Sequence, residues 1–254
     1  MTEPATAARP PRPMWQIVLA VLLGAFGVIA AAVLLRGWGI GPETTGPSAA
    51  ASAASELPWM ARAEPSGGVQ VMGVTVGGSA PSRLQQVQAL WPGEAMKLAV
   101  VQSPSGESSL EAFLELVQVG PLQGKLILSG GAGAQQVKDW MARAPASEPQ
   151  PSGARRYSLA ADDQASAAQA AVSGLVFLPS ARLDEATVQQ RFGVAQERMA
   201  LPDGSVHLLY PPRGLVISLD AAGKARPVLQ FVAPAEFEPR LQRPLRAAAA
   251  ASGS

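Results

Sequence analysis

Residues 184–232 read DEATVQQRFGVAQERMALPDGSVHLLYPPRGLVISLDAAGKARPVLQFV. Asp184 is a favourable N-cap, so a helix is predicted from Asp184 to Phe192, and Gly193 ends it. Short apolar runs separated by turn residues follow, and Asp203-Gly204 is typical of a hairpin turn. The pattern predicts a meander of four strands: 196–201, 205–210, 215–219 and 228–232.

Working towards the N-terminus, the same criteria predict a first unit. The segment 110–119 fits either a helix or the first arm of a hairpin, and the Pro121 turn before an apolar run favours the hairpin. Ser82 is predicted to cap a helix, and Asp162 or Asp163 to cap another that ends near Val172. The predicted strands are 69–76, 96–102, 155–160 and 175–178, and the predicted helices are 82–90 and 135–143.

Both halves therefore show a short helix followed by an antiparallel meander, roughly over residues 80–130 and 180–233. The second half resembles the SmpA/OmlA (BamE-like) domain, whose architecture recurs in tandem in β-lactamase inhibitor proteins. The resemblance rests on Phe192-Gly193-Val194-Ala195, where the family has Leu-Gly-x-Pro, and on the aromatic strand Leu208-Leu209-Tyr210. It implies an α+β fold with two helix-plus-meander units, and an envelope scaffold or binding module rather than an activity.

An apolar segment of 21 residues without a charge runs from Trp15 to Leu35. As a helix it would span about 30 Å, which matches the hydrocarbon core of a bilayer. Arg9 and Arg12 precede it and only Arg36 follows closely, so the N-terminus is expected in the cytoplasm and the rest in the periplasm. A cleaved signal peptide is the alternative. Gly24 and Gly27 could support self-association of the helix.

The chain then divides by composition. We expect a cytoplasmic N-terminus (1–14), a transmembrane helix (15–35), a Gly/Pro/Ala/Ser-rich flexible linker (36–68), a first α+β unit (69–144), a proline-rich connector (145–153), a second α+β unit (154–238) and a disordered tail (239–254). Trp59 belongs to an apolar island that would dock locally on the domain or the membrane.

Composition excludes several classes of function. The 254 residues include no cysteine and one histidine, so disulfides, thiol catalysis and multi-histidine or cysteine metal centres are excluded. A net charge of +1 gives no sign of nucleic-acid binding. No cofactor and no metal are expected.

Few residues could support chemistry. Ser205, His207 and Asp203 could form a triad, but no Gly-x-Ser-x-Gly turn is present, and we expect His207 to face solvent. The other candidates are a phosphate turn at Gly130-Gly131-Ala132-Gly133, without the third glycine at Gln136; a carboxylate pair at Asp162-Asp163; and anion-binding arginines at Arg155, Arg156, Arg240, Arg243 and Arg246.

These observations predict a single-pass inner-membrane protein with a periplasmic domain. We expect a non-enzymatic module for envelope protein interaction or assembly, which binds membrane lipid through residues 15–35 and an envelope protein through a sheet edge or the meander face. A periplasmic small-ligand or lipid-binding and sensing domain is the alternative, and a Ser205–His207 hydrolase is a third hypothesis.

Overall fold

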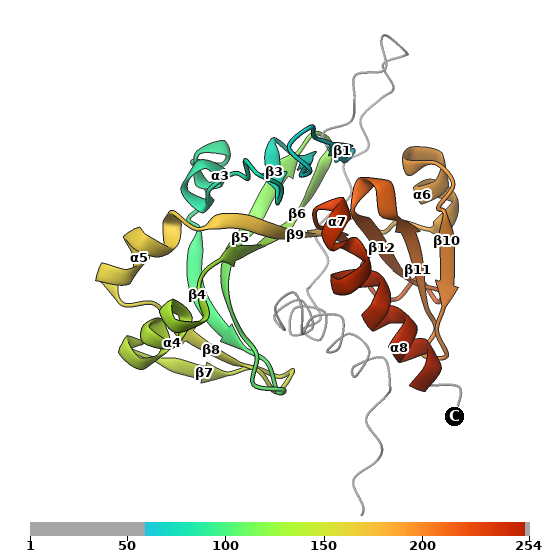
Figure 1. The fold of residues 1–254 in the computed structure, drawn as a ribbon. Helices are drawn as coiled ribbons and strands as arrows, with labels where there is room; N and C mark the ends of the chain where they lie inside the picture. The colour runs from blue at the N-terminus through green and yellow to red at the C-terminus, as the bar shows by residue number, and fades with distance from the viewer. Residues whose placement is uncertain (1–58, 252–254) are drawn as a thin grey trace, which may run out of the picture.

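The computed structural model describes residues 59–251 (Figure 1). Ten strands form one antiparallel sheet in the order β10-β11-β12-β13-β9-β6-β5-β4-β8-β7, and three more form a small sheet, β1-β2-β3. The strands are β1 (Arg62–Ala63), β2 (Val69–Val71), β3 (Val74–Val76), β4 (Lys97–Gln102), β5 (Ser108–Val119), β6 (Leu122–Gly131), β7 (Ser147–Pro149), β8 (Arg155–Ser158), β9 (Ala171–Pro179), β10 (Glu197–Ala200), β11 (Ser205–Tyr210), β12 (Leu215–Asp220) and β13 (Val228–Phe231).

The C-terminal meander is confirmed. Asp184 caps α6 (Glu185–Phe192), where its Oδ1 accepts a hydrogen bond of 2.7 Å from the Thr187 backbone N–H. Gly193 ends this helix, and β10, β11, β12 and β13 follow as consecutive antiparallel neighbours. The hairpin of β5 and β6 is also confirmed, with Gly120 at positive φ in its turn.

The predicted fold class is wrong. The α+β class with two helix-plus-meander units is replaced by a mostly β structure, because the strands of both halves join one sheet. Strand β9 makes this join: it pairs with β6 through Ile127↔Val176 and with β13 through Gln230↔Val176. The segment 175–178 was predicted as a short strand of the second unit, whereas β9 has nine residues and lies between the two halves.

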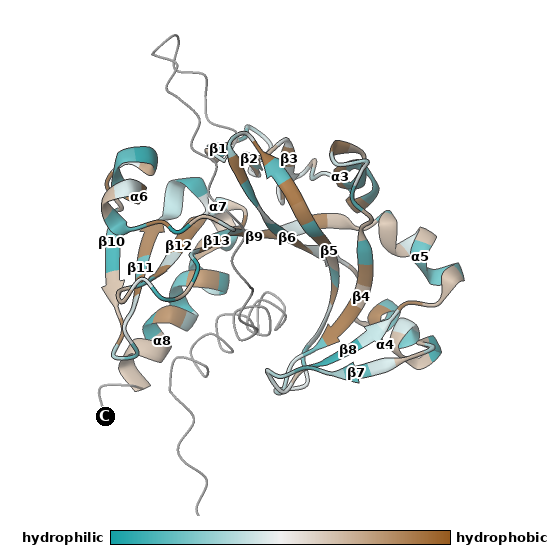
Figure 2. Ribbon diagram, turned by 180° about the vertical axis from the view of Figure 1, so that it is seen from behind, coloured by the Kyte–Doolittle hydropathy of each residue, from teal (hydrophilic) through white to brown (hydrophobic). Residues whose placement is uncertain are grey.

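Helices cover one face of the first half of the sheet and both faces of the second half, where α6 packs Phe192 against Tyr210 of β11. Three helices bury Val87, Trp140 and Ala167 against the outer face of the first half: α3 (Leu84–Leu90), α4 (Ala134–Arg143) and α5 (Ala161–Ala168). On the other face, the apolar side chains of β11, β12 and β13 pack with the C-terminal helices: α7 (Pro234–Phe237), the π-helix η2 (Glu238–Gln242) and α8 (Arg243–Ala251). The short 3-10 helix η1 (Pro211–Arg213) joins β11 to β12. Figures 1 and 2 show this arrangement from opposite sides.

The tail from residue 239, expected to be disordered, is helical as far as Ala251. Phe237, Leu241 and Leu245 recur every four residues and are buried, so one apolar stripe fastens the segment to the sheet. Residues 59–68, expected in the flexible linker, include strand β1 and the buried Trp59.

Three local predictions need correction. The strand predicted over 69–76 is the tight hairpin β2–β3, with Met72 and Gly73 at positive φ in its turn. Ser82 does not cap α3: its Oγ accepts from the Thr75 backbone N–H, and the N-cap is Arg83. The connector contains β7, which pairs with β8.

The predicted transmembrane helix (15–35), the predicted cytoplasmic N-terminus (1–14) and residues 36–58 of the predicted linker lie outside the described part. Within residues 59–251, no helix combines the length and apolar character needed to cross a bilayer.

Candidate functional site

The face of β4, β5 and β6 opposite to α3, α4 and α5 is here called the inner face. The strand register defines it: Ala99 lies opposite Glu111 and Val101 opposite Ser109, and across the next pair Glu111 lies opposite Ser129 and Phe113 opposite Ile127. The centre of the inner face therefore consists of Ala99, Val101, Ser109, Glu111, Phe113, Ile127 and Ser129. Among residues 59–251, no helix lies across β4 and β5 on this side (Figures 1 and 2).

Glu111 is the unusual member of this face. Its side chain is fully buried, and its Oε1 accepts a hydrogen bond from the Ser109 hydroxyl at 3.3 Å. Oε2 has no hydrogen-bond partner among the described residues. Burial raises the pKa of Glu111 to about 8, against smaller lowering effects of Ser109 and Arg156. The carboxyl group is therefore protonated at neutral pH, able to donate and to accept.

Arg156 stands at the border of the inner face. It lies on β8 opposite Val101, and its guanidinium carbon is 5.1 Å from the centroid of the Phe113 ring. This cation–π contact holds the positive charge near Glu111 without a direct hydrogen bond. The inner face thus combines apolar side chains and a neutral carboxyl group at its centre with cations at its edges: Arg156 on one side, and Lys97 and Lys125, which pair with Glu115, on the other.

The second polar cluster lies on β11 and β12. His207 was expected to face solvent, but its side chain is buried because the neighbouring strand supplies a partner. His207 Nδ1 lies 2.8 Å from the Ser218 hydroxyl, and Nε2 lies 3.0 Å from the Ser205 hydroxyl, which donates to Asp203 Oδ1 at 2.7 Å. Burial lowers the pKa of His207 to about 4, so the ring is neutral.

This cluster does not have the geometry of a catalytic triad. In a triad, the carboxylate orients the second nitrogen of the imidazole, and the first nitrogen accepts the serine proton. Here Asp203 instead accepts from Ser205, which assigns the Nε2–H of His207 as the donor to Ser205 and leaves Nδ1 to accept from Ser218. The chain of hydrogen bonds joins β11 to β12 and does not activate Ser205.

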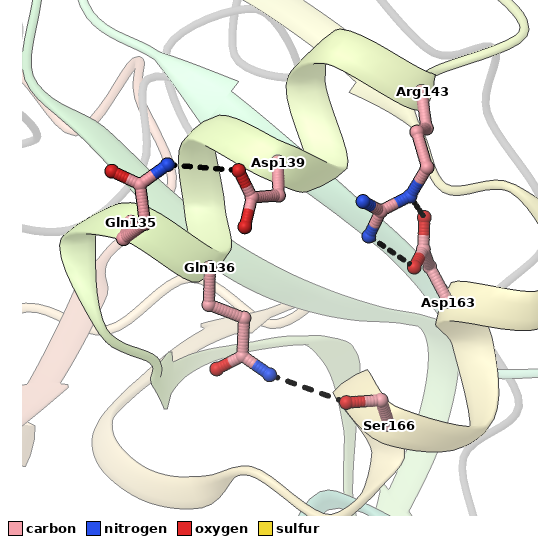
Figure 3. Close-up of polar contacts among 6 residues, drawn as sticks. All are labelled: Gln135, Gln136, Asp139, Arg143, Asp163 and Ser166. Atoms are coloured by element: carbon pink, nitrogen blue, oxygen red, sulfur yellow. Dashed lines mark hydrogen bonds and ion pairs between the residues drawn. The ribbon is translucent and has the colours of Figure 1, made fainter.

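The glycines and the aspartate pair have structural roles. Gly130 and Gly131 lie within β6, and a Cβ on Gly130 would approach the Leu110 side chain to 2.7 Å, so the close packing needs glycine. Gly133 is the N-cap of α4. Asp163 does not cap α5, whose N-cap is Ala160; it instead forms a bidentate ion pair with Arg143 of α4 (Figure 3).

The arginines considered for anion binding all have contacts within the chain. Those contacts are Arg155 with Ser147, Arg156 with the Phe113 ring, Arg240 with the Ser173 carbonyl, Arg243 with Glu238 and Arg246 with Glu197. Within residues 59–251, no group of three or more histidine and acidic side chains could hold a metal ion.

The two outer strands of the large sheet are poor templates for strand addition. Strand β7 carries Glu148 and Pro149, and β10 carries Glu197 and Arg198. Charged side chains and proline oppose pairing of an edge with another chain. Glu197 is in addition bonded to Gln242 beside α8. A partner is therefore better accommodated by a face of the sheet than by its edges.

Comparison of the chain with family models, with curated proteins and with solved structures finds no match. The sequence analysis did not single out Glu111, although the sequence contains a signal for it. Glu111 is the only acidic residue in the apolar run Leu110-Glu111-Ala112-Phe113-Leu114, and such a run is typical of a strand that is buried on both faces.

Proposed function

We propose that this protein is a non-enzymatic binding module, tethered to the inner membrane by residues 15–35, whose inner face binds an apolar polypeptide segment of an envelope protein. The periplasmic location of the module belongs to this proposal and rests on the arginines that flank residues 15–35. The observation that carries the binding role is the buried Glu111 with its unbonded Oε2 in an apolar face.

An isolated buried oxygen of this kind costs about 1–3 kcal/mol. Such a cost is offset when a bound partner supplies the missing hydrogen bond. A polypeptide fits because it carries a donor and an acceptor in every peptide group, while its apolar side chains can pack on Val101, Phe113 and Ile127. The blunted edges β7 and β10 favour this face over strand addition.

The proposal is tested by site-specific photocrosslinking in intact membranes. The full-length chain carries benzoylphenylalanine in place of Phe113 on the inner face or, as the matched control, in place of the exposed Ala89 on α3. We expect a defined envelope protein to be captured from position 113 and not from position 89. Equal capture from both positions, or capture of lipid alone from position 113, would overturn the proposal.

The captured protein is then purified and its dissociation constant measured. We expect Glu111→Leu to weaken binding by roughly tenfold, because one hydrogen bond to the partner is lost. Ala89→Leu should leave binding unchanged, and circular dichroism checks that both variants fold. Unchanged binding by a folded Glu111→Leu variant would contradict the assignment of the inner face.

A further inference from the structure

The inner face is buried even though no partner is bound to it. Ala99, Val101, Phe113 and Ile127 are each at most 5% exposed, and Glu111 is fully buried. Yet no helix among residues 59–251 crosses β4 and β5 on this side. Side chains this little exposed need a covering layer, and an apolar face without one would favour association with other molecules.

The sequence outside the described part contains a segment of matching chemistry. Residues 15–35 are apolar and uncharged, and Gly24, Gly27 and Ala30–Ala32 would let a helix approach the sheet closely. Residues 36–58 connect this segment to Trp59. A random coil of that length would have a root-mean-square span of roughly 25–30 Å. That span exceeds the radius of gyration of a domain of this size, about 16 Å.

The place where the described chain begins agrees with this reach. Trp59 is buried in the main core, with the Arg191 guanidinium 5.8 Å from its ring centroid, so the tether starts from a fixed point on the domain. Strand β1 then lies against the short helix η1, close to the junction of the two halves. The inner face and Trp59, from which the tether starts, therefore belong to the same folded domain.

We propose that residues 15–35 of the same chain dock on the inner face whenever they are not inserted in a bilayer, and that membrane insertion frees the face for its partner. This inference rests on the proposed function, because it describes the regulation of that binding surface. Two apolar environments, the hydrocarbon core of the bilayer and the inner face, compete for this segment. A chain that has not reached the membrane would be self-shielded and unable to bind its partner.

The absence of cysteine from the chain makes disulfide mapping direct. In the full-length protein, Ser129→Cys on the inner face is combined in turn with Ala25→Cys, Val28→Cys or Ala32→Cys. Ala89→Cys replaces Ser129→Cys in the matched control set. Each protein is made by cell-free synthesis without lipid or with phosphatidylethanolamine–phosphatidylglycerol vesicles, oxidised, and analysed on non-reducing gels.

Without lipid, we expect an intrachain disulfide with Ser129→Cys for at least one of the three positions, and at least five times less with Ala89→Cys. Vesicles should reduce the Ser129→Cys yield at least fivefold. No disulfide, equal yields for both sets, or a yield that vesicles do not change would overturn the inference. Disulfides between chains instead of within them would also overturn it and would assign the face to a second copy.

Failure of this inference is distinguishable from failure of the proposed function. The photocrosslink from position 113 is measured in membranes, where the proposal places residues 15–35 in the bilayer, and it does not depend on self-docking. Capture of the envelope protein together with the absence of any lipid-free disulfide would retain the binding function and reject the regulation.

Discussion

The two halves of the sheet each bury one ionisable side chain on the same side, and they treat it differently. In the second half, both ring nitrogens of His207 have hydrogen-bond partners, Ser205 and Ser218. In the first half, Glu111 has a partner for one oxygen and none for the other. The difference teaches that burial alone does not identify a functional group: a satisfied network holds strands together, whereas an unsatisfied one points to something that binds.

The comparison predicts opposite pH dependences, and this is the largest expected effect. His207 has a folded pKa lowered from 6.5 to about 4, so the unfolded state binds more protons in between and stability is lost as pH falls from 6.5 to 4. The loss is about 3–4 kcal/mol, at roughly 1.4 kcal/mol for each pH unit of the shift. Glu111 has a folded pKa raised from 4.5 to about 8, so its contribution is lost as pH rises from 4.5 to 8.

Urea unfolding of the full-length chain across pH 4–9 checks both signs. Between pH 4.5 and 6.5 the two slopes oppose each other and largely cancel in the parent chain. Glu111→Gln should therefore remove the decline above pH 6.5 and reveal the loss of stability as pH falls from 6.5 to 4, whereas His207→Gln should reveal a loss of stability as pH rises from 4.5. A Glu111→Gln variant that still loses stability between pH 6.5 and 8 would show that another group, and not the Glu111 carboxyl, causes the decline.

Replacement by leucine at fixed pH separates the two groups next. At pH 7, His207→Leu should lower the free energy of unfolding by about 2 kcal/mol, because it leaves the Ser205 and Ser218 hydroxyls without their partner. Glu111→Leu should stay within about 1 kcal/mol of the parent chain or stabilise it, because an unsatisfied polar group is removed. Chemical denaturation measures both, and a larger loss for Glu111→Leu than for His207→Leu would reverse the comparison.

A smaller effect is expected at the cap of α6 in the second half. Asp184→Ala removes the acceptor for the Thr187 backbone N–H and should lower the midpoint of thermal unfolding by about 2–4 °C. Asp184→Asn is the control, because asparagine also caps helices well and should restore most of the midpoint. If alanine and asparagine have the same effect, the cap does not stabilise the helix.

The smallest effect is expected at the contact between α4 and α5 in the first half. Arg143→Gln breaks the ion pair with Asp163, but the arginine side chain is 56% exposed. The midpoint of thermal unfolding should fall by no more than about 2 °C. In the parent chain, 0.5 M salt should weaken the stabilisation that this ion pair provides. A fall larger than that of Asp184→Ala would show that this pair matters more than its exposure indicates.

Features that depend on residues close together in the sequence could be predicted, and features that depend on residues far apart in the sequence could not. The cap at Asp184, the Gly193 stop and the β10–β13 meander depend on neighbouring residues, and all were predicted. The position of β9 between β6 and β13, the pair Arg143–Asp163 and the burial of His207 depend on residues brought together by the fold. The spacing of Phe237, Leu241 and Leu245 was a readable signal for the C-terminal helices, and the charged and alanine-rich composition around it obscured that signal.

The central place of β9 has a consequence for synthesis on the ribosome. Its partner β6 precedes it, but its other partner, β13, follows roughly fifty residues later. At about 5–20 residues per second, β9 therefore emerges several seconds before the strand that will cover its open side. During that interval the nascent chain exposes a nine-residue apolar edge, so a chaperone that shields such edges would protect the newly made protein from aggregation.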